Sequence, residues 1–217
     1  MAKRIIGVFL GVMILGTGSA LFKVSALGHD SLGALLFSVV YLFDKPYITY
    51  FICYVVFNLI LFIPMLIFDR KVIGIANFIS IFVTGLACDL ALYVFGKIPF
   101  LASPILFTRI ICSFLGLGFI AFGISLYGEA ALGINSYDEL PRLIIKLFNK
   151  ASYKVVRVLV DLTCTIIAFI IGNLILGRTD IISINTIVSF VVLGPLIGLF
   201  SKLVNKYYYH KENGVFE

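Results

Sequence analysis

The chain has 217 residues, of which 61% are apolar and only 13% are charged, and its mean hydropathy is +1.13. A water-soluble domain carries about 25% charged residues, so this composition excludes a surface that faces water throughout. The net charge of +6 fits basic loops of a membrane protein, and we expect no nucleic-acid partner.

Six long apolar segments follow in chain order, each near the ~20 residues that a membrane-spanning helix requires. Two further apolar segments are shorter, and both are too short to span as ordinary helices. We therefore predict an all-α, polytopic membrane protein with six transmembrane helices and two short helices that do not cross. The long segments lie at about 5–27, 47–68, 72–95, 105–127, 153–176 and 181–204, and the short ones at 31–44 and 136–150.

The orientation follows from the basic residues near the ends of these segments. With both termini in the cytoplasm, twelve Lys and Arg residues lie inside and five lie outside. Letting the two short helices cross weakens this bias. Because basic residues collect in cytoplasmic loops, we predict cytoplasmic N- and C-termini.

A repeated motif relates the two halves of the chain. The stretch 18–45 aligns without gaps to 123–150, and ten of 28 positions are identical, including "ALG" at 26–28 and at 131–133. Each half then contains a span, a turn led by glycine, a short helix and two more spans. Three crossings per half invert the second half, so we predict two inverted-topology repeats, 1–100 and 101–217, within a single membrane domain.

The turns between the first span and the short helix of each half are candidate sites. Gly28 and Gly133 suit a helix C-terminus. Asp30 or Ser31 is the candidate cap of the first short helix, and Ser136, in a capping box with Glu139, or Asp138 is that of the second. Two interpretations stay open for these turns. They are plain corners, or the free N–H groups of the short helices face a cavity and bind a polar or anionic ligand.

Charged and polar residues inside the spans are the other candidates, because they are expensive in a bilayer unless paired or functional. Glu129 directly precedes the second turn, and Arg157 and Asp161 are four residues apart on one helix face. The pair has either a structural role or a role in binding a ligand or proton. Asn185-Thr186 and the Gly194-Pro195 break mark either helix packing or a ligand-facing interruption.

Several chemistries have no signature in the sequence. Cys53, Cys88, Cys112 and Cys164 each lie in an apolar segment and without CxxC spacing, which favours packing over a metal site or disulfide framework. No catalytic motif is present. We expect no enzymatic activity, no cofactor and no bound metal.

The residue order resembles the YczE/YyaS/YitT-like family of bacterial integral membrane proteins. The similarity rests on a glycine-rich turn followed by Ser136-Tyr137-Asp138, then Arg157 with Asp161, Ser183-Ile184-Asn185-Thr186 and Gly194-Pro195. The chain departs from the family at Ser136, where proline is frequent, and at Ser183-Ile184-Asn185-Thr186, where Gly-x-Gly-Thr is typical. The resemblance implies a multi-pass protein of the bacterial cytoplasmic membrane and carries no defined activity.

The leading functional hypothesis is a transporter or channel for a small molecule or ion, with the lipid bilayer and a small polar or ionic substrate as partners. The candidate ligand-binding residues are Asp30, Glu129, Asp138, Arg157, Asp161, Asn185 and Thr186, and the structural turns contain Gly28, Gly133, Gly194 and Pro195. A substrate-capturing subunit of an energy-coupled uptake system and an accessory protein of envelope assembly or stress are the alternatives. A second copy of the chain or a partner subunit is also left open.

Overall fold

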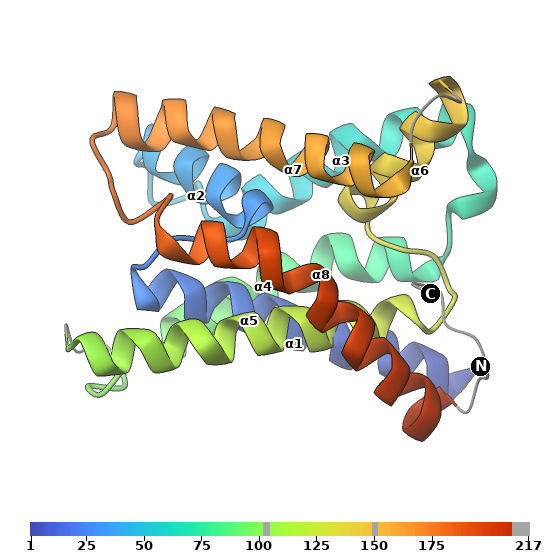
Figure 1. The fold of residues 1–217 in the computed structure, drawn as a ribbon, viewed down its shortest axis with the longest axis horizontal. Coiled ribbons are helices and arrows are strands. Elements are labelled where there is room, and N and C mark those ends of the chain that lie inside the picture. Colours follow the sequence, from blue (N-terminus) through green and yellow to red (C-terminus); the bar gives the residue numbers. More distant parts are fainter. Residues whose placement is uncertain (102–104, 149–151, 210–217) are drawn as a thin grey trace.

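The computed structural model describes residues 1–101, 105–148 and 152–209, and this part of the chain is all-helical (Figure 1). Six of its helices are long and apolar enough to cross a membrane, which confirms the predicted polytopic α-helical membrane protein. The helices are α1 (Ala2–Ser25), α2 (Ser31–Phe43), α3 (Tyr50–Phe68), α4 (Ile75–Phe95), α5 (Leu106–Gly128), α6 (Ser136–Phe148), α7 (Tyr153–Ala168) and α8 (Ile184–Val204).

The predicted segments match these helices closely, with the largest differences near the C-terminus. A π-helical segment, Phe169–Ile175, extends α7, and another, Asn205–Tyr209, carries α8 five residues beyond the predicted end. A short 3-10 turn, Arg70–Val72, separates α3 from α4. Residues 149 and 150, which the sequence placed at the end of the second short helix, lie outside the described residues.

The two turns led by glycine have the same backbone. Ala26 and Ala131 have φ values of 49° and 54°, and Gly28 and Gly133 have φ values of 98° and 100°. Each turn ends a long helix and begins a short one. Positive φ is costly for alanine and is easily adopted by glycine. The same uncommon pair of backbone conformations at both places indicates that the shared identities encode one local structure that is used twice.

The first helices of the two halves pack against each other at glycine. A Cβ on Gly11 would lie 2.9 Å from the Gly123 carbonyl oxygen, and a Cβ on Gly18 would lie 2.9 Å from that of Gly116. The pairing of rising with falling residue numbers makes α1 and α5 antiparallel. The absence of side chains lets the two backbones approach closely, as is common between membrane helices.

The buried apolar side chains form two clusters, each drawn from both halves of the chain. One lies mainly among α2, α3, α6 and α7, and the other mainly among α1, α4, α5 and α8. In Figure 1 the first group lies above the second, and α2 and α6 lie at opposite ends of the long axis. Large apolar side chains on α3, α7 and α8 remain exposed, as expected of surfaces that face lipid.

Each half also anchors the turn of the other half. The backbone N–H of Asn185, at the start of α8, donates to the Leu27 carbonyl at 2.8 Å, and the N–H of Ala76, at the start of α4, donates to the Leu132 carbonyl at 3.0 Å. The Asn77 side chain binds the Ile134 carbonyl and accepts from the Gly74 N–H at 2.8 Å. These bonds hold the two turns in place and so position the short helices.

Candidate functional site

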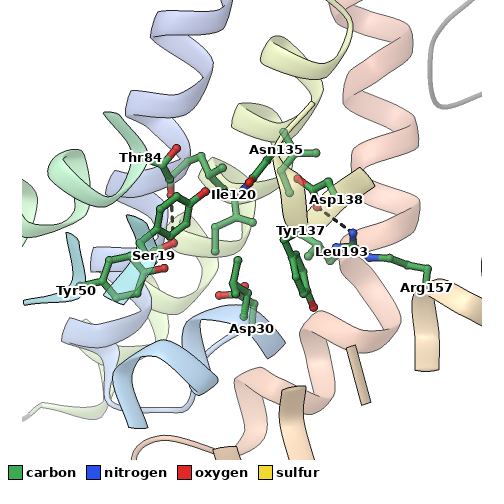
Figure 2. Close-up of a pocket in the computed structure, with 14 residues that line it drawn as sticks. Ser19, Asp30, Tyr50, Thr84, Ile120, Asn135, Tyr137, Asp138, Arg157 and Leu193 are labelled. Carbon is green, nitrogen blue, oxygen red and sulfur yellow. Dashed lines mark hydrogen bonds and ion pairs between the residues drawn. The ribbon is translucent and has the colours of Figure 1, made fainter. Parts of the chain in front are cut away.

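A cavity of about 40 Å³ lies between the two apolar clusters, with room for about three water molecules. Every one of the eight helices, or the residues that directly precede its first turn, contributes to its wall. Figure 2 shows the cavity with the side chains that line it. They are Leu15, Ser19, Asp30, Leu32, Tyr50, Tyr54, Thr84, Ile120, Ile124, Asn135, Tyr137, Asp138, Arg157 and Leu193.

The first turns of both short helices reach this cavity. Asp30 is the N-cap of α2, and its Oδ2 accepts a hydrogen bond from the Gly33 N–H at 3.4 Å. Asp138 lies in the first turn of α6 and also lines the cavity. The two motifs that are far apart in the sequence thus bring one carboxyl group each to the same space.

Arg157 of α7 bridges two carboxylates at the edge of the cavity. Its Nη1 lies 2.9 Å from Asp138 Oδ1 (Figure 2), and its Nε lies 3.2 Å from Asp161 Oδ2. Tyr127 donates to the other oxygen of Asp138, and Tyr137 donates to the other oxygen of Asp161. The guanidinium also lies 4.9 Å from the centre of the Tyr137 ring. The pair at four-residue spacing is therefore part of a larger network that includes the second turn.

The second short helix is more buried than its charged pattern indicates. Asp138, Arg142, Lys146 and Lys150 follow one another at four-residue spacing, a charged stripe that predicts a helix lying on the inner leaflet. In the structure Ser136, Tyr137, Glu139 and Leu143 are buried, and only the C-terminal end of α6 is exposed. The hydrogen bonds and ion pair that Asp138 makes inside the protein hold this first turn in the bundle.

Glu129 lies outside the network of Arg157 and its two carboxylates. It follows α5 directly and is fully buried, and its Oε1 accepts a hydrogen bond from the Ser201 hydroxyl of α8 at 2.8 Å. It does not line the cavity. The hydrogen bond from Ser201 joins the C-terminal end of α5 to the C-terminal part of α8, so Glu129 stabilises the packing of these two helices.

Asn185 binds the first turn, Thr186 caps the start of its own helix, and neither lines the cavity. The Asn185 Nδ2 donates to Ser25 Oγ at 3.1 Å and to the Gly28 carbonyl at 3.2 Å, and the Thr186 hydroxyl accepts from the Ser183 N–H at 3.4 Å. Gly194 and Pro195 lie inside α8, next to the cavity residue Leu193.

We expect Asn185→Ala to lower the free energy of unfolding by about 2–3 kcal/mol, because it leaves buried groups of the first turn without a partner. Thermal unfolding of the purified protein measures the loss. The matched control is Asn173→Ala, since the Asn173 side-chain oxygen has no hydrogen-bond partner within the described part of the chain. An equal effect of both substitutions would contradict the role assigned to Asn185.

Two basic residues, Lys23 near the end of α1 and Arg109 near the start of α5, do not line the cavity. They bind carboxylate and backbone oxygens near the C-terminal end of α1. Arg109 donates to the Ser25 carbonyl at 2.7 Å and also to that of Ala26, so it caps the C-terminus of α1. Asp180 lies 3.5 Å from Lys23 and 3.0 Å from Arg178. Burial raises the pKa of Asp180, but the hydrogen bonds and charges of these two cations outweigh it and hold that pKa below its usual range.

Sequence reasoning missed the hydroxyl and amide groups of the cavity. Tyr50 and Tyr54 lie one turn apart on α3, and Asn135 lies within the second turn, where its Nδ2 donates to the Tyr54 hydroxyl at 2.6 Å. Spacing of four residues places both tyrosines on one face, but in an apolar helix that pattern is equally typical of lipid-facing aromatics. Within the described residues, no group of three or more His, Cys, Asp or Glu side chains is placed to hold a metal ion.

Comparison with known proteins places the chain in a family. It is 29% identical over 202 residues to the uncharacterized protein YyaS of Bacillus subtilis (strain 168), covering 93% of this chain and 94% of that protein. No solved structure matches it. The model of a family of unknown function, DUF6198, matches residues 2–202. The resemblance to YyaS-like membrane proteins is thereby confirmed, and the chain belongs to the DUF6198 family.

Proposed function

We propose that this protein is a transporter of a small polar or ionic solute in the bacterial cytoplasmic membrane, and that the solute binds in the cavity between the two helix groups. The observation that carries the proposal is the composition of the cavity wall. In this largely apolar protein, the wall of one internal space contains two aspartates, an arginine and several hydroxyl groups. Polar groups inside a membrane protein usually mark the pathway of a substrate or ion.

The architecture supports alternating access to this cavity. The two halves repeat the same order of helices, and the proposed topology is inverted, with three crossings per half and both termini in the cytoplasm. In inverted-repeat transporters the substrate lies at the interface of the repeats, near the ends of broken helices. Here α2 and α6 take the place of such broken helices, since both first turns reach the cavity.

The two apolar clusters suggest which parts move. The helices α1, α4, α5 and α8 share one cluster, and α2, α3, α6 and α7 share the other. The cavity has walls from both, so a rotation of one group against the other opens it first to one side and then to the other. The reaction is solute movement without chemical change, and the protein is not an enzyme in this proposal.

Uptake into liposomes that contain only the purified protein tests the proposal. We expect uptake of a small solute with no ATPase present, and we expect Leu193→Trp to reduce it at least about tenfold by filling the cavity. Leu199→Trp on the same helix is the matched control, because the Leu199 side chain is exposed. The chain has no tryptophan, so each variant also carries a single fluorophore that reports folding.

Absence of uptake across a broad panel of small solutes would sink the transporter proposal. If binding persisted without uptake, the substrate-capturing subunit would replace it. A failure of Leu193→Trp to reduce uptake would place the pathway outside the cavity.

The proposed inversion has its own test. Reporters fused after Lys45 and after Lys150 are expected on opposite sides of the membrane, because these positions follow the two short helices of inverted halves. Both reporters on the same side would refute the inverted topology. A fusion at the C-terminus, expected in the cytoplasm, calibrates the assay.

A further inference from the structure

Two oxygen atoms at the cavity have no hydrogen-bond partner within residues 1–101, 105–148 and 152–209. They are Asp30 Oδ1 and Asn135 Oδ1, and both residues line the cavity. Asn135 is only 2% exposed. Buried polar atoms in native structures nearly always have a partner, so these atoms indicate a place for a molecule that is a hydrogen-bond donor.

The charge of the cavity also requires a donor. Its charged side chains are Asp30, Asp138 and Arg157, and the arginine is already bound by Asp138 and by Asp161. Among the described residues, Asp30 accepts one long hydrogen bond, from the Gly33 N–H at 3.4 Å. Its carboxylate therefore remains without a cation, and burying such a charge unpaired is costly.

The partial positive charge of the helix N-termini does not reverse this balance. At the start of α2 it is matched by the N-cap Asp30 itself, and at the start of α6 by Asp138 and Glu139. An anion in the cavity would meet two carboxylates, with Arg157 already occupied. This site is therefore unsuited to a carboxylate or phosphate.

Aromatic rings complete the wall. Tyr50, Tyr54 and Tyr137 all line the cavity, and the rings of Tyr50 and Tyr54 lie 5.9 Å apart. Figure 2 shows Tyr50 on one side of the space above Asp30 and Tyr137 on the other. A carboxylate among aromatic faces is a favourable environment for an organic cation.

We propose that the solute bound in this cavity is a small ammonium-type cation, with Asp30 as its carboxylate partner and the tyrosine rings around it. The identification of the bound solute as the transported one rests on the proposed function. The volume of about 40 Å³ restricts the ligand to a few heavy atoms, such as methylammonium or ethylammonium.

An alkali ion fits the same observations less well. In Figure 2 Asp30 lies across the cavity from Asn135, and an alkali ion has no apolar group to cover the tyrosine rings of the cavity wall. An alkylammonium ion has several N–H donors on one side and an apolar group on the other. It can donate to Asp30 with its N–H groups and cover the aromatic rings with its apolar group.

Ligand-dependent thermal stability tests the inference without any transport. The four cysteines are free and buried, so a thiol-reactive fluorophore reports unfolding of the purified, detergent-solubilised protein. We expect methylammonium and ethylammonium chloride to raise the unfolding temperature saturably. Sodium, potassium and tetramethylammonium chloride at equal ionic strength are expected to leave it unchanged, because all three lack N–H donors and tetramethylammonium is also too large for the cavity.

The matched variants are Asp30→Asn and Asp44→Asn. Both remove one carboxylate from an end of α2, but Asp44 is exposed at the C-terminal end. We expect Asp30→Asn to weaken methylammonium binding at least about tenfold, because a charge-assisted hydrogen bond is lost. We expect Asp44→Asn to leave the binding unchanged. Asn keeps the N-cap of α2, and Asp30→Ser is a second uncharged cap if the first variant does not fold.

Three results would overturn the inference: an equal shift with sodium or potassium, an equal shift in the Asp30→Asn protein, or no shift with any alkylammonium salt. Uptake of some other solute without an alkylammonium shift would reject this inference and leave the transporter intact. An Asp30-dependent shift without uptake in liposomes would support the ammonium site and reject the transporter.

Discussion

Arg157→Ala is expected to lower the free energy of unfolding by about 3 kcal/mol or more. The substitution leaves Asp138 and Asp161 without the cation that bridges them, and removing one partner of a buried ion pair strands the other charge. The side chain of Arg157 is 23% exposed and that of Asp138 is 12% exposed, so water screens the network only in part. Thermal unfolding with a thiol-reactive fluorophore measures the loss.

Arg178→Ala is the control, because Arg178 also binds a carboxylate but its side chain is 41% exposed. Its loss is expected to cost about 1 kcal/mol or less. Adding Asp138→Asn and Asp161→Asn to Arg157→Ala is expected to recover part of the stability, since the stranded charges are removed. A triple variant no more stable than Arg157→Ala would show that the cost comes from lost packing.

Gly133→Ala is expected to cost about 3–5 kcal/mol, from backbone strain and steric overlap together. Gly133 has a φ of 100°, and a Cβ there would lie 2.2 Å from Asn77 Oδ1 and 2.9 Å from the Gly74 nitrogen. The clash would push the start of α4 away from the second turn and disturb the first turn of α6. Thermal unfolding of the purified variant measures the effect.

Gly177→Ala separates the two causes. Gly177 also has a positive φ, 65°, but a Cβ there would have no atom within 4 Å. We expect a loss of about 1 kcal/mol from strain alone. If Gly133→Ala cost no more than Gly177→Ala, the close contact between the second turn and α4 would have no energetic importance.

The repeated motif shows how far local sequence determines local structure. The two copies of "ALG" lie 105 residues apart, and both adopt the same pair of positive φ values. A glycine at the third position permits that backbone, and the apolar runs before it determine where the long helices end. The helix boundaries were for this reason predictable to within a few residues.

The candidate site was predictable only in part. Asp30, Asp138 and Arg157 line the cavity, and Asp161 joins it through Arg157. Glu129 and Asn185, singled out by the same rule that buried polar groups in membranes have a function, instead join helices and turns. A polar residue in an apolar segment indicates that a partner exists, but the sequence does not indicate whether that partner is protein or ligand.

The sequence by itself determined the class of protein, the six spans, the two short helices and the turns that precede them. These features depend on apolar segment length and on backbone preferences, which are local properties. Only the tertiary structure decided that both turns face one cavity, that Arg157 reaches Asp138, and that Asp30 keeps an oxygen without a partner in the described part of the chain. Those facts depend on how eight helices pack, and packing brings together residues whose spacing along the chain carries no signal.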